Sequence, residues 1–298
     1  MGRATACRSE PGALSADPAL PADLEATVAR ALAEDLGSGD LTAQLVPAGT
    51  RCRARVITRE AAVLCGAAFA DAVFRQLDPQ LRLRWHAVDG ERLAAGALLF
   101  ESDGPARALL TGERTALNFL QTLSATATAA RRYVEELAGT GCTLLDTRKT
   151  VPGLRLAQKY AVRCGGGRNH RIGLFDGILI KENHIAAAGS IGAAVAAARA
   201  LGTGVPIEVE VESRAELEQA FAAGADLALL DDFTLAELRE AVARNRARSQ
   251  PLGLEASGGI DLDNIREVAA TGVDYVSVGA ITKHLRAIDL SMRFELLA

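Results

Sequence analysis

The second half of the chain repeats one pattern of apolar and polar positions. From residue 142 onward, short apolar runs alternate with longer stretches of helix-forming residues. The six runs, in chain order, are CTLLD, GILIK, PIEVEVE, LALLD, LEASGG and YVSVGA. Strands that are mostly apolar and alternate with helices are typical of a parallel sheet covered by helices. The pattern therefore predicts an α/β fold with six parallel strands.

Six strands are fewer than the eight of a complete α/β barrel. Two folds fit this number: a barrel with fewer strands, or an open doubly wound sheet. Polar residues and glycines stand at the carboxyl ends of the runs, which is where barrel enzymes place their chemistry. This position favours the incomplete parallel barrel.

The first half of the chain has a mixed pattern. Residues 23–36 form an amphipathic stretch that predicts a helix, and residues 106–137 predict a much longer one. Between these helices lie three runs that predict strands: RCRARVITRE, LRLRWHAV and GALLFES. The mixture predicts a separate α+β domain. Residues 1–21, rich in Ala, Pro and Ser, are expected to be a flexible leader.

The residues at the predicted strand ends define a candidate site. Parallel strands bring their carboxyl ends to one face, so the groups that follow them should meet there. In chain order these groups are Asp146, Arg148, Lys149, Lys181, Glu210, Glu212, Asp231, Ser257, Gly258, Gly259 and Gly279. The late glycines would allow backbone N–H groups to approach a phosphate. A charge or a glycine at every strand end indicates a functional site.

Carboxylates in the run PIEVEVE predict a metal site. Glu208, Glu210 and Glu212 alternate with valines, so all three point to one face of the strand. On an edge strand that face would simply be wet. In a strand covered by helices it would point into the barrel, where Glu210 and Asp231 are placed to share Mg²⁺.

Charge is distributed unevenly along the chain. The formal net charge is -4, yet residues 146–184 hold eight Lys and Arg against three Asp and Glu. An acidic chain lacks the broad positive field that draws proteins to nucleic acid or anionic membranes, whereas one local cluster suits a small anion. Two alternatives are a solvated basic face and a non-catalytic module that binds an anion or RNA.

Other features exclude several classes of protein. The uncharged stretch at residues 185–198 is too short and too rich in Gly and Ala to span a bilayer. The five cysteines are scattered and never spaced as C-x-x-C, which argues against a disulfide framework and a zinc site. A cytoplasmic location is therefore expected. Cys164 is expected to be a structural thiol, because no Cys/His/Asn pattern accompanies it.

Basic and titratable residues near the glycine-rich octet CGGGRNHR receive different interpretations. Arg155, Lys159 and Arg163 recur every four residues on one predicted helix and are expected to form a mostly solvated stripe. His170 follows three glycines in the octet and is interpreted as a ligand contact. His86 lies in a strand-like run and is expected to be structural.

The longest motifs resemble one enzyme family. The stretch DTRKTVPGLRLAQKYAVRCGGGRNHRIGLFDGILIKENHI follows ERTALNFLQTLSATAT and precedes EVEVES, LLDDF, ASGG and GVDYVSVGAITKH. In order and spacing, from about residue 24 to the end, these segments resemble the quinolinate phosphoribosyltransferases. The resemblance implies phosphoribosyl transfer from phosphoribosyl pyrophosphate to quinolinate with decarboxylation. The products would be nicotinate mononucleotide, pyrophosphate and CO₂, in de novo NAD biosynthesis.

The resemblance also implies roles for individual residues. The residues that contact quinolinate would be Arg148, His170, Arg171 and Lys181, with Arg114 reaching in from a second subunit. The catalytic residues would be Lys149, Lys181, Glu210 and Asp231, of which Glu210 and Asp231 would act through Mg²⁺. The residues near the 5′-phosphate would be Ser257, Gly258, Gly259, Gly279 and His284.

The same resemblance implies a domain organisation and an assembly. It implies an α+β sandwich domain at residues 22–125, an incomplete barrel at 126–286, and a segment at 287–298 that returns to the first domain. The assembly would be a head-to-tail homodimer, or a higher oligomer.

Three residues depart from the family pattern, and one close alternative remains. Asp232 stands where Asn is usual, Arg168 where small or apolar residues are common, and Phe175 is bulky for its place. The alternative is a paralogous phosphoribosyltransferase of the same fold, acting on another acid or within metal-cofactor metabolism. A monoacid enzyme would not need all of Arg114, Arg148 and Arg171, so the number of cations favours a dicarboxylate.

Overall fold

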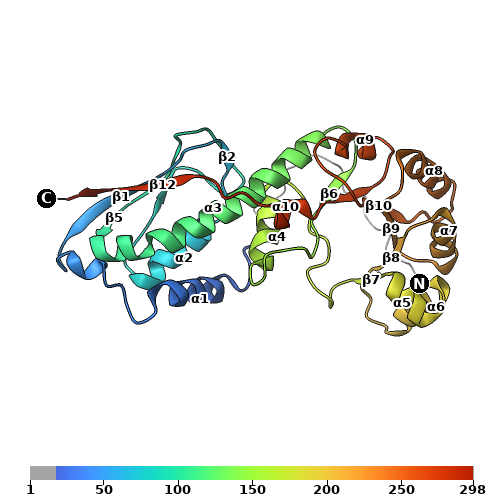
Figure 1. Ribbon diagram of the computed structural model, residues 1–298, viewed down its shortest axis with the longest axis horizontal. Coiled ribbons are helices and arrows are strands. Elements are labelled where there is room, and N and C mark those ends of the chain that lie inside the picture. The colour runs from blue at the N-terminus through green and yellow to red at the C-terminus, as the bar shows by residue number, and fades with distance from the viewer. Residues whose placement is uncertain (1–17, 298) are drawn as a thin grey trace.

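The N-terminal part of the molecule is built on a four-stranded antiparallel sheet. The computed structural model describes residues 18–297, so the predicted leader lies almost entirely outside the described residues. The strands, in spatial order, are β12 (Leu290–Leu296), β1 (Arg51–Thr58), β5 (Leu98–Pro105) and β3 (Arg84–Trp85). Pairing of β12 with β1 runs from Cys52 opposite Leu296 to Thr58 opposite Leu290. The last residues of the chain therefore lie on the sheet of its first part (Figure 1).

Three helices pack together against this sheet and confirm the predicted α+β class. They are α1 (Leu24–Leu36), α2 (Ala67–Leu77) and α3 (Ala106–Glu136). The smaller elements of this part are a 3₁₀ turn at Ala43–Leu45 and the strand pair β2 (Ala62–Val63) and β4 (Arg92–Leu93). The strand LRLRWHAV predicted from the sequence is real but short, because only Arg84 and Trp85 pair with β5.

Helix α2 was not predicted from the sequence. The N–H groups of Gly66 and Ala67 at its start donate to the carboxylate of Asp89, each at 3.1 Å. In many helices a side chain just before the first turn caps the N–H groups, and such a residue can be recognised in the sequence. Because the cap of α2 comes from a distant residue, the sequence before the helix carries no such signal.

The second part is a curved sheet of six parallel strands, as predicted. The spatial order is β6 (Thr143–Leu145), β11 (Tyr275–Ser277), β10 (Gly253–Ser257), β9 (Leu227–Asp231), β8 (Ile207–Val211) and β7 (Ile178–Ile180). The first and second runs of the sequence, β6 and β7, form the two edges, so the barrel stays open between them. On the β6 side, Arg168 forms an isolated parallel bridge with Leu145.

Helices connect and cover the strands of the barrel. They are α4 (Arg155–Cys164), α5 (Glu182–Ala188), α6 (Ile191–Ala200), α7 (Arg214–Ala223), α8 (Leu235–Arg246), α9 (Ile265–Ala269) and α10 (Ala280–Lys283). Local caps start three of them: Ser190 accepts from the Ala193 N–H, Ser213 from Glu216 and Thr234 from Glu237. Such caps explain why these helices were readable from the sequence.

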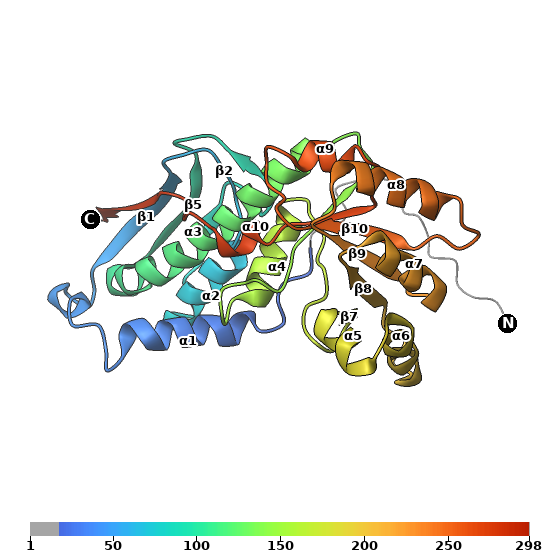
Figure 2. The ribbon, with the colours of Figure 1, turned by 45° about the vertical axis from the view of Figure 1, so that its right-hand side comes forward.

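Helix α3 joins the two parts of the molecule. Its residues up to Ala127 pack in the core of the N-terminal part, and its residues from Ala130 onward pack in the core of the barrel. Figure 2 shows the helix passing from one part to the other. None of the helices in the described part of the chain combines the length and apolar character needed to cross a membrane.

Candidate active site

Polar residues lie together at the carboxyl ends of the barrel strands, which form one end of the barrel. This end is called the carboxyl edge of the sheet. The pairing places Asp231 opposite Ser257 on β9 and β10, and Glu210 opposite Leu229 on β8 and β9. Lys181 follows β7 directly as the N-cap residue of α5, and Gly279 precedes α10 after β11. The tertiary structure thus collects at one edge residues that are far apart in the sequence.

A lysine and a carboxylate pair at this edge. Lys181 Nζ and Glu210 Oε2 form an ion pair across the ends of β7 and β8. The Glu210 side chain is 10% exposed and the Lys181 side chain 42% exposed. The pair therefore lies at the mouth of the barrel, where the ammonium group can reach a bound molecule.

Two arginines, Arg148 and Arg171, lie close enough for their charges to interact. Burial lowers the pKa of the Arg171 guanidinium, and the positive charge of Arg148 lowers it further. Arg171 Nη1 donates to the carbonyl oxygen of Gly177 at 3.2 Å. Arg148 Nε is buried and has no hydrogen-bond partner in the described part of the chain. An unpaired buried donor is costly, and a bound carboxylate would satisfy it.

Lys149 packs against Gly279, so the ends of β6 and β11 meet. A Cβ atom on Gly279 would lie 2.9 Å from Lys149 Cδ, a contact that real Cβ atoms essentially never show. The hydroxyl of Thr282 donates to the carbonyl oxygen of Lys149 at 2.8 Å. Glycine at 279 therefore makes room for the lysine stem, in addition to any role beside a phosphate.

The loops after β9 and β10 interlock at the predicted phosphate region. Gly258 and Gly259 have φ of 90° and 56°, and Asp232 has φ of 54°. The Asp232 side chain occupies the space that a Cβ atom on Gly258 would need. Aspartate and asparagine both tolerate the left-handed conformation, so the departure from Asn at this position adds a negative charge without changing the backbone.

Two other predicted site features lie near these loops. A pocket of about 300 Å³ is lined by Ser257 and Gly258, together with residues of α8 and α9. His284 is exposed at the C-terminal end of α10. Both are placed at the carboxyl edge of the sheet, on the side of β10 and β11.

Arg114 is separate from the other predicted site residues within one chain. It is exposed on α3, sixteen residues before Ala130, the first residue of this helix in the barrel core. At 1.5 Å per residue this separation is roughly 24 Å along the helix. No hydrogen bond or ion pair among the described residues joins Arg114 to the strand-end residues of its own subunit.

The predicted solvated stripe on α4 is wrong for its central residue. Lys159 is 2% exposed and forms a buried ion pair with Asp146, which is fully buried. Its flanking residues also have partners: Arg155 donates to the carbonyl oxygen of Ile172, and Arg163 to that of Ala19. The spacing was read correctly as one face of a helix, but this face packs against the end of β6.

His170 lies in a buried cluster with two carboxylates that the sequence did not suggest. Its Nε2 atom is 2.9 Å from Glu208 Oε2 and 3.4 Å from Glu255 Oε2. Burial lowers the pKa of His170, but the two carboxylates more than offset this and raise the pKa to about 10. Burial raises the pKa of Glu208. Only Glu208 had been noticed, as part of the alternation on β8, where Glu212 proves to be exposed.

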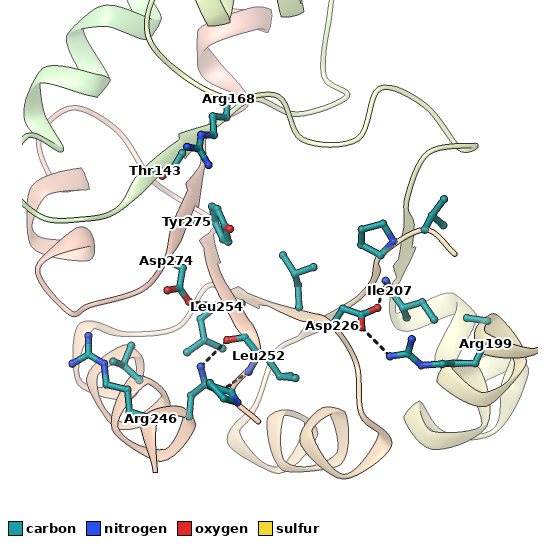
Figure 3. A pocket seen from close by; sticks show the side chains of 18 of the residues that line it. Thr143, Arg168, Arg199, Ile207, Asp226, Arg246, Leu252, Leu254, Asp274 and Tyr275 are labelled. Atoms are coloured by element: carbon teal, nitrogen blue, oxygen red, sulfur yellow. Dashed lines mark hydrogen bonds and ion pairs between the residues drawn. The ribbon is translucent and has the colours of Figure 1, made fainter. Parts of the chain in front are cut away.

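A larger pocket, of about 1260 Å³, lies at the opposite end of the barrel (Figure 3). Its wall is formed by the first residues of five strands: Thr143, Ile207, Leu227, Gly253 and Tyr275. Its acidic side chains serve the backbone there, because Asp226 accepts from the Ile207 N–H at 2.8 Å and Asp274 from the Leu254 N–H at 2.9 Å. The side chain of Arg168 lines this pocket, so it lies away from the carboxyl ends of the strands, although its backbone bridges Leu145 at the end of β6. Phe175 is exposed.

Fold and site together define a class of protein: an open α/β barrel with cations and carboxylates gathered at the carboxyl ends of its strands. The family models agree with this class. Residues 40–124 match the N-terminal domain of quinolinate phosphoribosyl transferase, and residues 126–293 match its C-terminal domain. The chain therefore belongs to the quinolinate phosphoribosyltransferase family, the decarboxylating enzymes of de novo NAD biosynthesis, and the resemblance seen in its motifs is confirmed.

Individual relatives support the same assignment. The "Probable nicotinate-nucleotide pyrophosphorylase [carboxylating]" of Bacillus subtilis is 44% identical over 262 residues, which are 87% of this chain and 89% of that one. The corresponding protein of Mycobacterium leprae is 44% identical over 89% of this chain and 95% of its own length. The solved nicotinate-nucleotide pyrophosphorylase of Francisella tularensis is 48% identical, with a TM-score of 0.89 over 94% of this chain and 99% of that one.

Proposed function

We propose that the residues at the carboxyl edge of the barrel carry out the family reaction in this chain. Phosphoribosyl would pass from phosphoribosyl pyrophosphate to the ring nitrogen of quinolinate, with loss of one carboxylate as CO₂. The observation that carries this proposal is the Nε atom of Arg148, buried without a partner next to a second guanidinium. A carboxylate bound there would accept a hydrogen bond from this atom and balance the two positive charges.

The two carboxylates of quinolinate explain the number of cations. Arg148 and Arg171 offer planar, forked donors, which match a carboxylate in two parallel hydrogen bonds. Lys181 adds a mobile ammonium at the same edge. Together these groups neutralise a dianion, whereas a monoacid would leave part of the cluster unpaired. His170 belongs to this region, but its ring is engaged inside the protein.

The phosphoribosyl donor is assigned to the acidic and glycine-rich side of the edge. Glu210 and Asp231, on neighbouring strands, supply the oxygen ligands that suit Mg²⁺. When bound there, Mg²⁺ would neutralise charge on the departing pyrophosphate. The phosphates would lie near Lys149 and the loops that contain Ser257, Gly258, Gly259, Gly279 and His284.

The reaction needs no nucleophile from the protein. The protein has to hold the two substrates and shield them from water. As pyrophosphate leaves, C1 of the ribose becomes cation-like, and the pyridine nitrogen forms a bond to it. The positively charged ring then accepts the electron pair of the adjacent C–CO₂⁻ bond as CO₂ departs, and that carbon takes up a proton. The cations fix two polyanions in contact and exclude water between them.

One assay tests this proposal directly. Quinolinate plus phosphoribosyl pyrophosphate should give Mg²⁺-dependent release of pyrophosphate with equimolar CO₂. Nicotinate in place of quinolinate should release neither product at a comparable rate. Turnover of nicotinate without CO₂ would favour the paralogous monoacid enzyme instead.

Arg148→Lys is expected to keep the fold and weaken quinolinate binding. Lysine retains the charge but cannot form the fork, so at least one charge-assisted hydrogen bond is lost, at a cost of about 1.5–3 kcal/mol or roughly 10- to 100-fold in KM. Steady-state kinetics with quinolinate varied at saturating phosphoribosyl pyrophosphate measure this. Arg53→Lys, on the surface of the N-terminal sheet, is the matched control. Wild-type kinetics of Arg148→Lys would refute the assignment.

Assembly and location are also part of the proposal. A homodimer, or a higher oligomer built from it, would bring Arg114 of one subunit to the strand ends of the other, which its distance from its own barrel favours. A cytoplasmic location fits the cysteines of the described residues, because Cys52, Cys65, Cys142 and Cys164 are all free.

A further inference from the structure

The assignments above do not explain why His170, Glu208 and Glu255 form a cluster. The three side chains come from different elements: the segment after α4, strand β8 and strand β10. Glu208 is 4% exposed and Glu255 only 1% exposed. Oε1 of Glu208 and both oxygens of Glu255 accept no hydrogen bond in the described part of the chain, and Oε2 of Glu255 has only its 3.4 Å ion-pair contact with His170. Such buried carboxylates are expensive to maintain, which indicates that they serve a purpose.

Both ring nitrogens of His170 are occupied within the protein. Nε2 faces the oxygens of Glu208 and Glu255. Nδ1 accepts a hydrogen bond from the backbone N–H of Arg171 at 2.7 Å. Because Nδ1 accepts, the extra proton of the cluster lies between Nε2 and the two carboxylates, and neither nitrogen is turned toward a ligand at the strand ends.

The backbone of His170 is held as firmly as its ring. Its N–H donates to Asp146 Oδ1 at 2.9 Å, and its carbonyl oxygen accepts from Lys159 Nζ at 3.0 Å. Asn169, the residue before it, donates to Asp146 Oδ2 at 2.6 Å. Four groups of His170 are therefore held by the protein: the backbone N–H, the carbonyl oxygen, and the ring atoms Nδ1 and Nε2.

Arg171 directly follows His170 in the chain, so its position depends on how His170 is held. Its backbone N–H is one of the four contacts, so the direction of its side chain depends on the His170 ring. The guanidinium has a single described protein partner, the carbonyl of Gly177, and lies close enough to Arg148 for the two charges to repel. Two like charges stay together in a partly buried site only if the backbone places them there.

We propose that His170, Glu208 and Glu255 are a positioning unit that sets Arg171 beside Arg148, and that His170 does not bind quinolinate directly. This inference rests on the proposed function, since it assigns the unit to the dicarboxylate half of the site. Glu255 is the member best suited to a test. It contacts the ring at Nε2, whereas the Arg171 N–H is bound at Nδ1. It is also not next to a proposed metal ligand, whereas Glu208 is two residues from Glu210.

Glu255→Gln is expected to raise the KM for quinolinate by roughly 10- to 100-fold, because small misplacements of a binding group cost this much. The KM for phosphoribosyl pyrophosphate and the melting temperature should stay near the wild-type values. Glu295→Gln, exposed at the end of β12, is the control. If Glu255→Gln does not fold, Glu255→Asp keeps the charge and is measured in the same way.

The decisive measurement repeats Glu255→Gln in an Arg171→Ala background. If Glu255 acts through Arg171, the quinolinate KM of the double variant equals that of Arg171→Ala alone. A further increase, an equal increase in both substrates' KM, or an unchanged quinolinate KM in Glu255→Gln overturns the inference. If Arg171→Ala itself binds quinolinate normally, the proposed substrate position fails, and the inference fails with it.

Discussion

Mixing Arg114→Ala with Lys181→Ala subunits should restore activity that neither variant has alone. Each variant is expected to lose roughly 30- to 5,000-fold in kcat/KM, because truncating one partner of a desolvated charge pair costs about 2–5 kcal/mol. In a mixed dimer, one site keeps both Lys181 from its own barrel and Arg114 from the other subunit. The second site lacks both.

The expected recovery follows from the symmetry of a dimer. Random association makes half of the dimers mixed, and each has one intact site, so activity should reach about a quarter of wild type. Co-expression with two affinity tags isolates the mixed species. The structure motivates this experiment because Arg114 is exposed on the part of α3 that packs in the N-terminal core.

A control separates shared sites from simple mixing. A mixture of Lys181→Ala subunits with Glu210→Gln subunits should not recover activity, because both residues belong to the barrel of the same subunit and form one ion pair. Recovery in this control, or none in the Arg114 mixture, would show that Arg114 does not act across the interface.

Lys159→Met should destabilise the protein by about 3–5 kcal/mol, because it leaves the Asp146 carboxylate buried without its cation. Burial raises the pKa of Asp146 and lowers that of Lys159, so each charge is unfavourable there without the other. Thermal or urea unfolding followed by far-UV circular dichroism measures the loss.

The double variant Asp146→Asn with Lys159→Met tests the physical reason. Removing both charges removes the unpaired one, so the double variant should be more stable than Lys159→Met alone. Arg53→Met is the surface control, since Arg53 and Asp103 form an ion pair at 2.7 Å with both side chains more than two-fifths exposed. Its effect should stay within about 1 kcal/mol. Additive losses in the buried double variant would contradict this account.

Lys159 also shows where prediction from the sequence stopped. The four-residue spacing correctly placed three basic residues on one helix face, but the pattern does not reveal what that face meets. Asp146, thirteen residues earlier, had been assigned to the strand-end face and instead points to the helix. A local pattern gives the direction of a side chain relative to its own element, and the partner comes from packing.

Glu255 is a second example. It stands in LEASGG, a run read as a strand because of its apolar residues and its terminal glycines. A single carboxylate inside such a run has no partner nearby in the sequence. It is also not part of a repeating pattern that would draw attention to it. Its meaning appears only when β10 and β8 place it and Glu208 around the same imidazole. Glu208 was visible in the sequence because two more glutamates repeated its spacing.

The sequence by itself determined the alternation of strands and helices, the six-stranded incomplete barrel, the strand-end positions of the polar residues, and a family resemblance that the family models bear out. These properties depend on neighbours within one element or on long motifs. Only the tertiary structure decided that Asp89 caps α2, that Lys159 is buried and that His170 is enclosed by carboxylates. Those contacts join residues from separate elements, and burial in a common core sets their charge and orientation.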